Sequence, residues 1–161
     1  MFIEAQDSGS SPQGVVEVML KAEIKTHLKD HYLLEKAGTY HGEPRYPMLV
    51  NIDGQAATWE VEGKKESAPN YIDKSVKRNP ERGEGMKYSL SKRIWLSPGS
   101  HRVFFGLPGD RVSKEVVITV EEGKPSVLEF KPVYRRYRTQ GSIFTRGVSR
   151  LKAFWNGTLL P

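Results

Sequence analysis

The sequence contains no cysteine, and this absence excludes several kinds of protein chemistry at once. Without cysteine there are no disulfide bonds, no thiol nucleophile and no cysteine-ligated zinc site. The sequence also lacks an apolar run near the roughly 18 residues that a transmembrane helix requires. At the start of the chain, Phe2 and Ile3 form a short apolar patch with no basic residues before it, unlike a signal peptide. We therefore expect no transmembrane segment and no signal peptide in this sequence.

Sequence motifs for cofactor binding and catalysis are missing as well. The chain has no Walker loop, no dinucleotide glycine fingerprint, no nucleophile elbow and no calcium loop. Ser100 and His101 are adjacent, which does not favour a nucleophile–base pair, and a turn accounts for both residues. His27 and His31 would share a metal only on a helix, and no third ligand is defined, so exposed polar positions are favoured. We predict a protein that is not an enzyme and has no cofactor and no metal site.

Positive charge is concentrated at one end of the sequence. The net charge is +6, from 25 basic and 19 acidic residues. Residues 131–161 hold seven of the basic residues and no acidic residue, which leaves residues 1–130 with 18 basic and 19 acidic groups. This segment also contains aromatic side chains, a combination that suits phosphate-rich partners, acidic glycans or anionic membrane surfaces. The candidate binding residues are Arg135, Arg136, Arg138, Arg146, Arg150, Lys152 and Trp155.

The C-terminal segment 135–161 also has a purely structural interpretation. Its apolar residues would close a β-fold as final strands, with the arginine side chains facing solvent. An unpacked segment with this many apolar residues would be prone to aggregation, which favours the structural interpretation slightly. Asn156-Gly157 is a preferred two-residue hairpin turn and would lie between two such strands.

Most of the chain between residues 15 and 134 shows the alternating pattern of half-buried β-strands. Residues 15–25 alternate between apolar and charged side chains, and residues 47–61 form two runs around Asp53-Gly54, a preferred hairpin turn. Further alternating runs extend from Met86 to Tyr134, separated by turns that contain proline or glycine. These patterns predict an all-β fold, namely an antiparallel immunoglobulin-like β-sandwich of about seven strands.

The remaining segments are less regular. Residues 1–14 are polar and rich in glycine and serine, so we expect a flexible leader. Residues 26–37 suit either a strand or one short helix, and the neighbouring strands favour a strand. Residues 62–85 are polar and interrupted by prolines and glycines, which predicts a long loop. Trp59 and Trp95 offer flat faces for sugar rings, although aromatic residues at strand spacing are more often core residues.

The stretch from Tyr88 to Pro132 is the best-organised part of the sequence. A strand that ends at Leu96 is followed by Pro98-Gly99-Ser100-His101 and then by a strand that begins at Val103, and later turns fall at Pro108-Gly109 and Gly123. This arrangement resembles the PEGA domain, a small bacterial β-sandwich with a Pro-Gly-x-His turn. Upstream, residues 49–55 are similar to the family's strand that ends in Val-Asp-Gly. The long connection between the two stretches departs from the family, which has a short link there.

The resemblance implies an interaction module of a bacterial cell envelope, located in the periplasm or at the cell surface, and it carries over no catalytic residue. Two hypotheses about the partner follow. In the first, another protein of the envelope docks on an edge strand, on the 62–85 loop or on the basic segment. In the second, an acidic polymer or glycan binds the basic C-terminal segment, and its affinity falls steeply with salt because counterions are released on binding.

Overall fold

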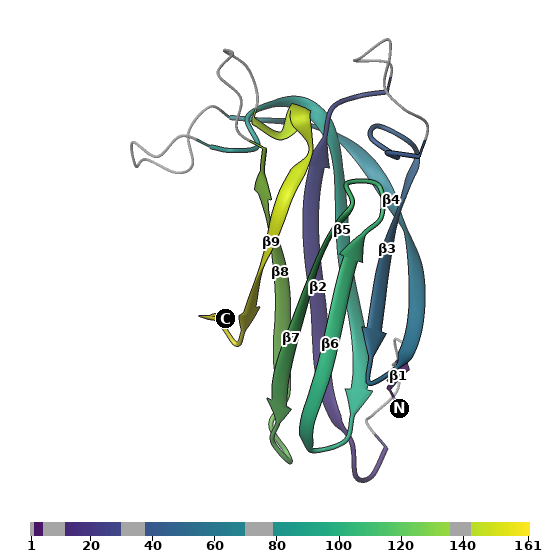
Figure 1. Ribbon diagram of the computed structural model, residues 1–161, viewed down its shortest axis with the longest axis vertical. Helices are drawn as coiled ribbons and strands as arrows, with labels where there is room; N and C mark the ends of the chain where they lie inside the picture. Colours follow the sequence, from purple (N-terminus) through teal and green to yellow (C-terminus); the bar gives the residue numbers. More distant parts are fainter. Residues whose placement is uncertain (1, 5–11, 30–37, 70–78, 136–142) are drawn as a thin grey trace.

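The computed structural model describes residues 2–4, 12–29, 38–69, 79–135 and 143–161, and these residues form an all-β structure (Figure 1). Ten strands belong to one continuous sheet. Within the described ranges, no helix is long and apolar enough to cross a membrane. The elements are β1 (Ile3–Glu4), β2 (Val16–Thr26), β3 (Arg45–Ile52), β4 (Gln55–Ala68), β5 (Gly83–Leu96), β6 (Gly99–Leu107), β7 (Val112–Val120), β8 (Ser126–Tyr134), the 3-10 helix η1 (Ile143–Arg146), β9 (Val148–Trp155) and β10 (Thr158–Leu159).

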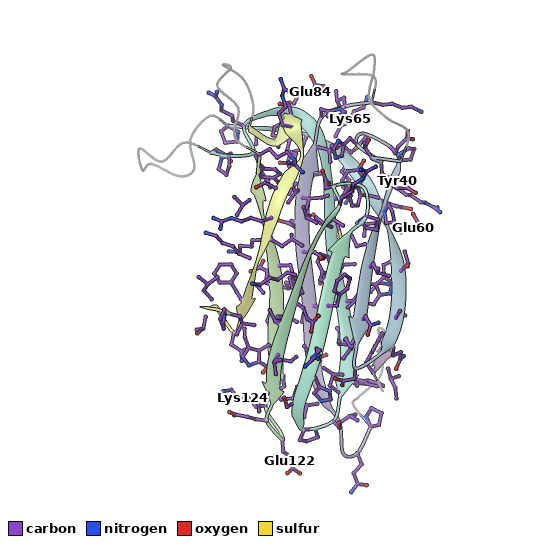
Figure 2. All side chains as sticks on the ribbon, viewed as in Figure 1. Tyr40, Glu60, Lys65, Glu84, Glu122 and Lys124 are labelled. Atoms are coloured by element: carbon purple, nitrogen blue, oxygen red, sulfur yellow. The ribbon has the colours of Figure 1, made fainter. Side chains whose placement is uncertain are left out.

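The strand order is β10-β9-β8-β2-β5-β4-β3-β6-β7, with β1 added to β5. Neighbouring strands are antiparallel except β2 and β8, which run parallel with Val18 opposite Ser126 and Ala22 opposite Phe130. The predicted purely antiparallel arrangement is therefore wrong, and the sheet is mixed. Strands β2 and β8 both begin at the same end of the molecule, where Figure 2 shows Glu122 and Lys124 in the turn before β8, and they therefore run in the same direction.

Strand β4 changes its partner part-way along and thereby curls the sheet. Its first part, residues 55–62, pairs with β3, whereas Gly63 and the residues that follow pair with β5. A Cβ atom on Gly63 would lie 2.6 Å from Met86 Cγ and 2.7 Å from Tyr88 Cε1, so the crossing point has no room for a side chain. The curl places β6 and β7 across from β2 and β8 (Figure 1).

The core fills the space between the two facing halves of the sheet. Along β2 the predicted alternation holds as far as Ile24, since Val18 and Leu20 are fully buried whereas Lys21 is exposed. It fails at Lys25, which was predicted to face outward and is fully buried. The rings of Phe105 on β6 and Phe130 on β8 stack with centroids 4.5 Å apart, which joins the two halves. Burial of such side chains from water supplies most of the stabilising free energy of a fold of this kind.

The turns divide into two kinds. Asp53-Gly54 and Asn156-Gly157 connect paired strands, and all four residues have positive φ angles of 52°, 93°, 49° and 84°, as the predicted two-residue hairpin turns require. The turn at Pro98-Gly99 differs, because β5 and β6 pair with other strands and not with each other. This turn carries the chain from one half of the curled sheet to the other.

Several predicted boundaries need correction. The expected loop 62–85 is shorter than predicted, because residues 62–68 extend β4 and residues 83–85 begin β5, and only part of the connection between them is described. The expected leader contains β1, and residues 5–11 lie outside the described ranges, as do residues 30–37 of the strand-or-helix segment. The short helix in the described part of the chain is η1, at residues 143–146.

Candidate functional site

The basic C-terminal segment contributes strand β9, which pairs with β8 over most of its length. Val148, Leu151 and Ala153 point inward and are buried, whereas Arg150 and Lys152 point outward and are exposed. A register shift between Val133 and Tyr134 places the extra residue of β9 at Ser149 and explains two successive exposed positions. The apolar residues of the segment therefore complete the sheet, and the basic residues face solvent.

The outward side of β8 and β9 carries a small cluster of cations and one aromatic ring. Lys131 on β8 lies directly opposite Lys152 on β9, and its Nζ atom stands 5.0 Å from the centre of the Phe154 ring. The two strands contain one carboxylate, Glu129, which lies 3.8 Å from Lys131 Nζ. We call Lys131, Arg150, Lys152 and Phe154 the basic face.

The predicted binding residues do not all reach this face. Arg135 is exposed just beyond β8, where its backbone N–H donates to the Gly147 carbonyl at 2.9 Å, and Arg146 is exposed in η1. Trp155 lies opposite Leu128 on the inner side and packs against the core, so it does not belong with Arg150 and Lys152. Arg136 and Arg138 fall outside the described residues.

Sequence reasoning missed Phe154 as a member of this face. The signal was present, because alternation along a strand places residues 150, 152 and 154 on one side and residues 151, 153 and 155 on the other. The prediction chose Trp155 by residue type and not by position. Alternation also places Trp59 on the inner side, whereas it places Trp95 on the side opposite Ile94 and Leu96. Both indoles are nevertheless buried, with 8% and 9% of their surface exposed, so neither is a sugar platform.

A shallow groove of about 590 Å³ lies on the outward side of the other half of the sheet. Its floor is apolar, since Leu49, Ala56 and Phe104 line it, and the ring of Phe104 leans over Gly106. Arg102 and Glu115 form an ion pair at its rim, with 3.3 Å between Arg102 Nε and the carboxylate. The groove is a second surface on which a ligand could rest.

A buried polar cluster holds Asp110, in the turn between β6 and β7. The Tyr46 hydroxyl donates to Asp110 at 2.6 Å, His41 Nε2 lies 2.7 Å from the same carboxylate, and the Val148 backbone N–H donates at 3.2 Å. Burial and the negative charge of Asp110 raise the pKa of Tyr46. Because these groups are buried, their effect is to tie the turn to β3 and β9, and the arrangement offers no open position for a substrate.

A second buried cluster surrounds Lys25 at the end of β2. Its Nζ atom donates to the carbonyls of Glu81 and Gly83, at 2.8 Å and 2.6 Å, and stands 4.9 Å from the centre of the Phe144 ring. Burial lowers the pKa of Lys25, although the carboxylates of Glu66 and Glu81 oppose the shift. The Tyr134 hydroxyl donates to Glu81 at 2.8 Å, and burial raises the pKa of Tyr134 well above its usual value. The cluster anchors the start of β5.

His101 joins the two turns that were singled out in the sequence. Its Nδ1 atom lies 2.5 Å from the Asp53 carboxylate and its Nε2 atom 2.7 Å from the Ser97 carbonyl. The ring therefore bridges the Asp53 turn and the end of β5. Partial burial raises the pKa of Asp53, but the hydrogen bonds from His101 and from the Arg102 N–H, at 2.9 Å, outweigh this effect and hold the pKa below its usual value.

The described residues contain no group of three or more potential ligands that could hold a metal ion. His27 is buried against the Leu28 carbonyl and the ring of His41, and the proposed partner His31 lies outside the described residues. No protein-family model matches the chain, and neither does any curated protein or solved structure.

Proposed function

We propose that the chain is a non-catalytic binding module that holds an acidic partner, such as an acidic polymer or glycan, on its basic face. The observation that supports this proposal is the alignment of Lys131, Arg150 and Lys152 on one outward side with a single carboxylate among them. The described residues offer neither Arg150 nor Lys152 an ion pair, so both cations are available to an anionic partner.

Phe154 gives this face a second kind of contact. A half-buried ring beside cations lets a partner stack on its open part while the partner's negative groups contact lysine and arginine. Adjacent cations on neighbouring strands match a polymer whose negative groups repeat along its length. A phosphate or carboxylate on a single small molecule would use only one or two of them.

The proposed setting is a bacterial envelope, with the chain as a PEGA-like β-sandwich in the periplasm or at the cell surface. The contact between Asp53 and His101 supports this assignment, because it links the two separate stretches of sequence that carry the resemblance. Asp53 belongs to the Asp-Gly turn and His101 to the Pro-Gly-x-His turn, so one hydrogen bond accounts for both motifs. A structural role for these residues agrees with a module that has no catalytic site.

The test replaces three cations on the basic face in the full chain. Lys131→Ala, Arg150→Ala and Lys152→Ala together should weaken binding to a heparin oligosaccharide or to polyglutamate about tenfold or more at low salt. The plot of log affinity against log salt concentration should also become less steep. Each neutralised charge contributes roughly 0.7–0.9 to this slope in nucleic acids, so the loss of three cations should reduce it by about two to three. Affinity is measured by fluorescence titration over a range of salt concentrations.

A matched control removes the same charge elsewhere. Lys64→Ala, Lys65→Ala and Lys124→Ala change three other exposed lysines and should leave the affinity within about twofold, because none lies on β8 or β9. Equal losses in both triple variants would show that only the net charge matters and would contradict the proposal. Substitutions are required here because deleting β9 would remove Val148, Leu151 and Ala153 from the core and leave β8 without a neighbour on that side.

A further inference from the structure

Apolar side chains gather next to the basic face, on the same outward side of the sheet. Alternation along β8 places Val127 and Glu129 on this side. The strand register then places Phe154 of β9 opposite Glu129, and Leu159 of β10 opposite Phe154. On the other side of β8, Met19 of β2 lies beside Val127. We call Met19, Val127, Phe154 and Leu159 the apolar patch.

The apolar patch is open to solvent. Leu159 and Val127 are 56% and 36% exposed, and the side chains of Met19 and Phe154 are half-buried. Single exposed apolar residues are common on proteins, but these four lie on four neighbouring strands. With about 4.8 Å between strands, the patch is about 15 Å wide. A contiguous patch of this kind is typical of a surface that binds a protein or a membrane.

Lysine side chains border the apolar patch along one side. Lys131 of β8 lies opposite Lys152 of β9, two residues from Phe154 on the same side of the sheet. Lys21 of β2 is exposed and lies beside Glu129. Glu129 is the carboxylate among them, 3.8 Å from Lys131 Nζ. Apolar side chains next to lysines match a lipid surface, which exposes negative headgroups directly above its acyl chains.

The outward carboxylates of β2 at either end of this region already have cationic partners. Glu17 accepts a hydrogen bond from the Arg93 side chain, and Glu23 lies 3.7 Å from Lys87 Nζ. Their negative charges are therefore partly neutralised within the protein. This arrangement reduces the repulsion that a negatively charged surface would meet at β2.

The shape of the sheet suits contact with a flat surface. Strand β4 changes its partner and curls the sheet around the core, so the outward side that carries the apolar patch is convex. The four residues of the patch belong to β2, β8, β9 and β10, and none of them lies in a connection between strands. Because paired strands hold their backbone in place, little conformational entropy is lost when the patch binds.

We propose that the apolar patch and the adjacent lysines form a docking surface for an anionic lipid membrane. The apolar side chains enter the boundary between headgroups and acyl chains, while Lys21, Lys131 and Lys152 contact the phosphate groups. Because few side chains are involved, binding is peripheral and reversible. The electrostatic part rests on the function proposed for the basic face, which shares two of these lysines, whereas the apolar part has its own observations.

The experiment measures binding of the full chain to vesicles of equal parts phosphatidylcholine and phosphatidylglycerol by co-sedimentation. Val127→Ser together with Leu159→Ser should lower the apparent affinity about tenfold or more, because apolar contact is lost without a change of net charge. Vesicles of phosphatidylcholine alone should bind the wild type at least about tenfold more weakly, because the lysines then face no net negative charge.

Val117→Ser is the matched control. Val117 is 58% exposed on the outward side of β7, in the other half of the curled sheet. The same change of an exposed valine at this position should leave the vesicle affinity within about twofold, because Val117 lies outside the apolar patch. Circular dichroism checks that every variant keeps the native fold.

A fluorescent label reports whether the apolar patch enters the membrane. The sequence contains no cysteine, so Leu159→Cys supplies a unique thiol for an environment-sensitive fluorophore. Its emission should shift to shorter wavelength when the mixed vesicles are added, because the label leaves water. The same label on Val117→Cys should show no shift. Attraction of the cations alone would hold the protein near the vesicle without moving the label out of water.

A heparin oligosaccharide separates this proposal from the function proposed for the basic face. The double serine variant should bind heparin as the wild type does, because neither Val127 nor Leu159 is charged. Binding of the wild type to heparin but not to the mixed vesicles would overturn the lipid proposal and leave the proposed function intact. Binding to the vesicles alone would support the lipid surface and contradict the acidic polymer, and binding to neither would contradict both.

Three further results would overturn the proposal. Equal vesicle affinity in the wild type and the double serine variant would mean that the cations act alone. An unchanged emission of the label at position 159 would mean that the apolar patch stays in water. A concentration-dependent dimer of the wild type that Leu159→Ser abolishes would mean that a second copy of the chain covers the patch.

Discussion

Asp53 has two tasks at one position of the turn between β3 and β4. Its backbone adopts a positive φ of 52°, which aspartate and asparagine tolerate better than most residues. Its carboxylate accepts hydrogen bonds from His101 and from the Arg102 N–H, and so fastens this turn to the next strand in the sheet order. A neutral residue of the same shape would preserve the positive φ of the turn and weaken the hydrogen bonds to His101 and Arg102.

Asp53→Asn should therefore lower the free energy of unfolding at neutral pH by about 1 kcal/mol, the size of one hydrogen bond at a partly exposed site. Its effect should depend on pH. Because the pKa of Asp53 is lower in the folded state, its contribution is present above about pH 4 and disappears as pH falls through the folded value. Urea unfolding at a series of pH values measures this difference.

The informative quantity is the difference in free energy of unfolding between wild type and variant at each pH, because the other carboxylates titrate in both proteins. That difference should shrink towards zero in acid. A difference that stays constant down to acid pH would mean that the backbone turn, and not the charge of Asp53, is responsible. His101→Gln should show a loss in the same direction, because it removes the ring from the same contact.

At the scale of single residues, the sequence was informative where the cause is local. The Asp53-Gly54 and Asn156-Gly157 turns were predicted correctly because the φ angles depend on the two residues themselves. The partnership of Asp53 with His101 could not be predicted, because it links residues 48 positions apart in the chain. The different faces of Trp155 and Phe154 could have been predicted, since strand alternation alone separates them.

Strand β4 shows how one element shapes the molecule. The sequence predicts the first half of β4 as the hairpin partner of β3. Its second half is polar, and the sequence predicts a loop there. That half pairs with β5 nevertheless, because its backbone hydrogen bonds do not require apolar side chains. Gly63 stands at the change of partner and has Met86 and Tyr88 in the space where a side chain would be.

Gly63→Ala should lower the free energy of unfolding by about 1–3 kcal/mol, as expected for overpacking of a filled site. The Met86 side chain has room to adjust, whereas Tyr88 is held by its hydroxyl, which donates to the Glu43 carbonyl at 2.6 Å. The variant is compared with Ser67→Ala, at an exposed position later in β4, which should change the free energy by no more than about 0.5 kcal/mol. Urea denaturation measures both, and equal effects would contradict a packing role for Gly63.

For the elements, alternation predicted the strands between residues 15 and 134 well, because burial of one face repeats every second residue. The same pattern carries no information about which strands become neighbours. The parallel pairing of β2 with β8 and the crossing turn at Pro98-Gly99 depend on how the whole chain passes between the two halves. The basic face could not be predicted for the same reason, because it combines residues of two neighbouring strands, β8 and β9.

The molecule as a whole should be sensitive to alkali because three buried tyrosines must remain protonated. Burial raises the pKa of Tyr46, Tyr134 and Tyr88, the last to about 12. In the unfolded chain each would release its proton near pH 10, so above that pH the unfolded state binds fewer protons. Stability is therefore complete below about pH 10 and falls above it, by about 1.4 kcal/mol per pH unit for each tyrosine.

Tyrosinate absorbance and circular dichroism, followed together through an alkaline titration, measure this effect. Of the seven tyrosines, these three should ionise only as the fold is lost. Tyr134→Phe should make the loss of stability with pH less steep by one proton. Ionisation of all seven near pH 10 with native circular dichroism would contradict the prediction. The lowered pKa of Lys25 has the opposite effect on stability. Because the unfolded chain takes up this proton first, the free energy of unfolding falls as pH drops below about 10.4.

The position of β2 has a consequence for synthesis of the chain on the ribosome. Strand β2 is made before both of its long-range neighbours in the sheet, β5 and β8, and β8 is made only after β5, β6 and β7. A nascent chain that has reached the turn after β7 therefore still exposes one hydrogen-bonding edge of its central strand. The sheet becomes continuous only after residues 126–134 leave the exit tunnel, so β2 gains its second neighbour later than its first, β5.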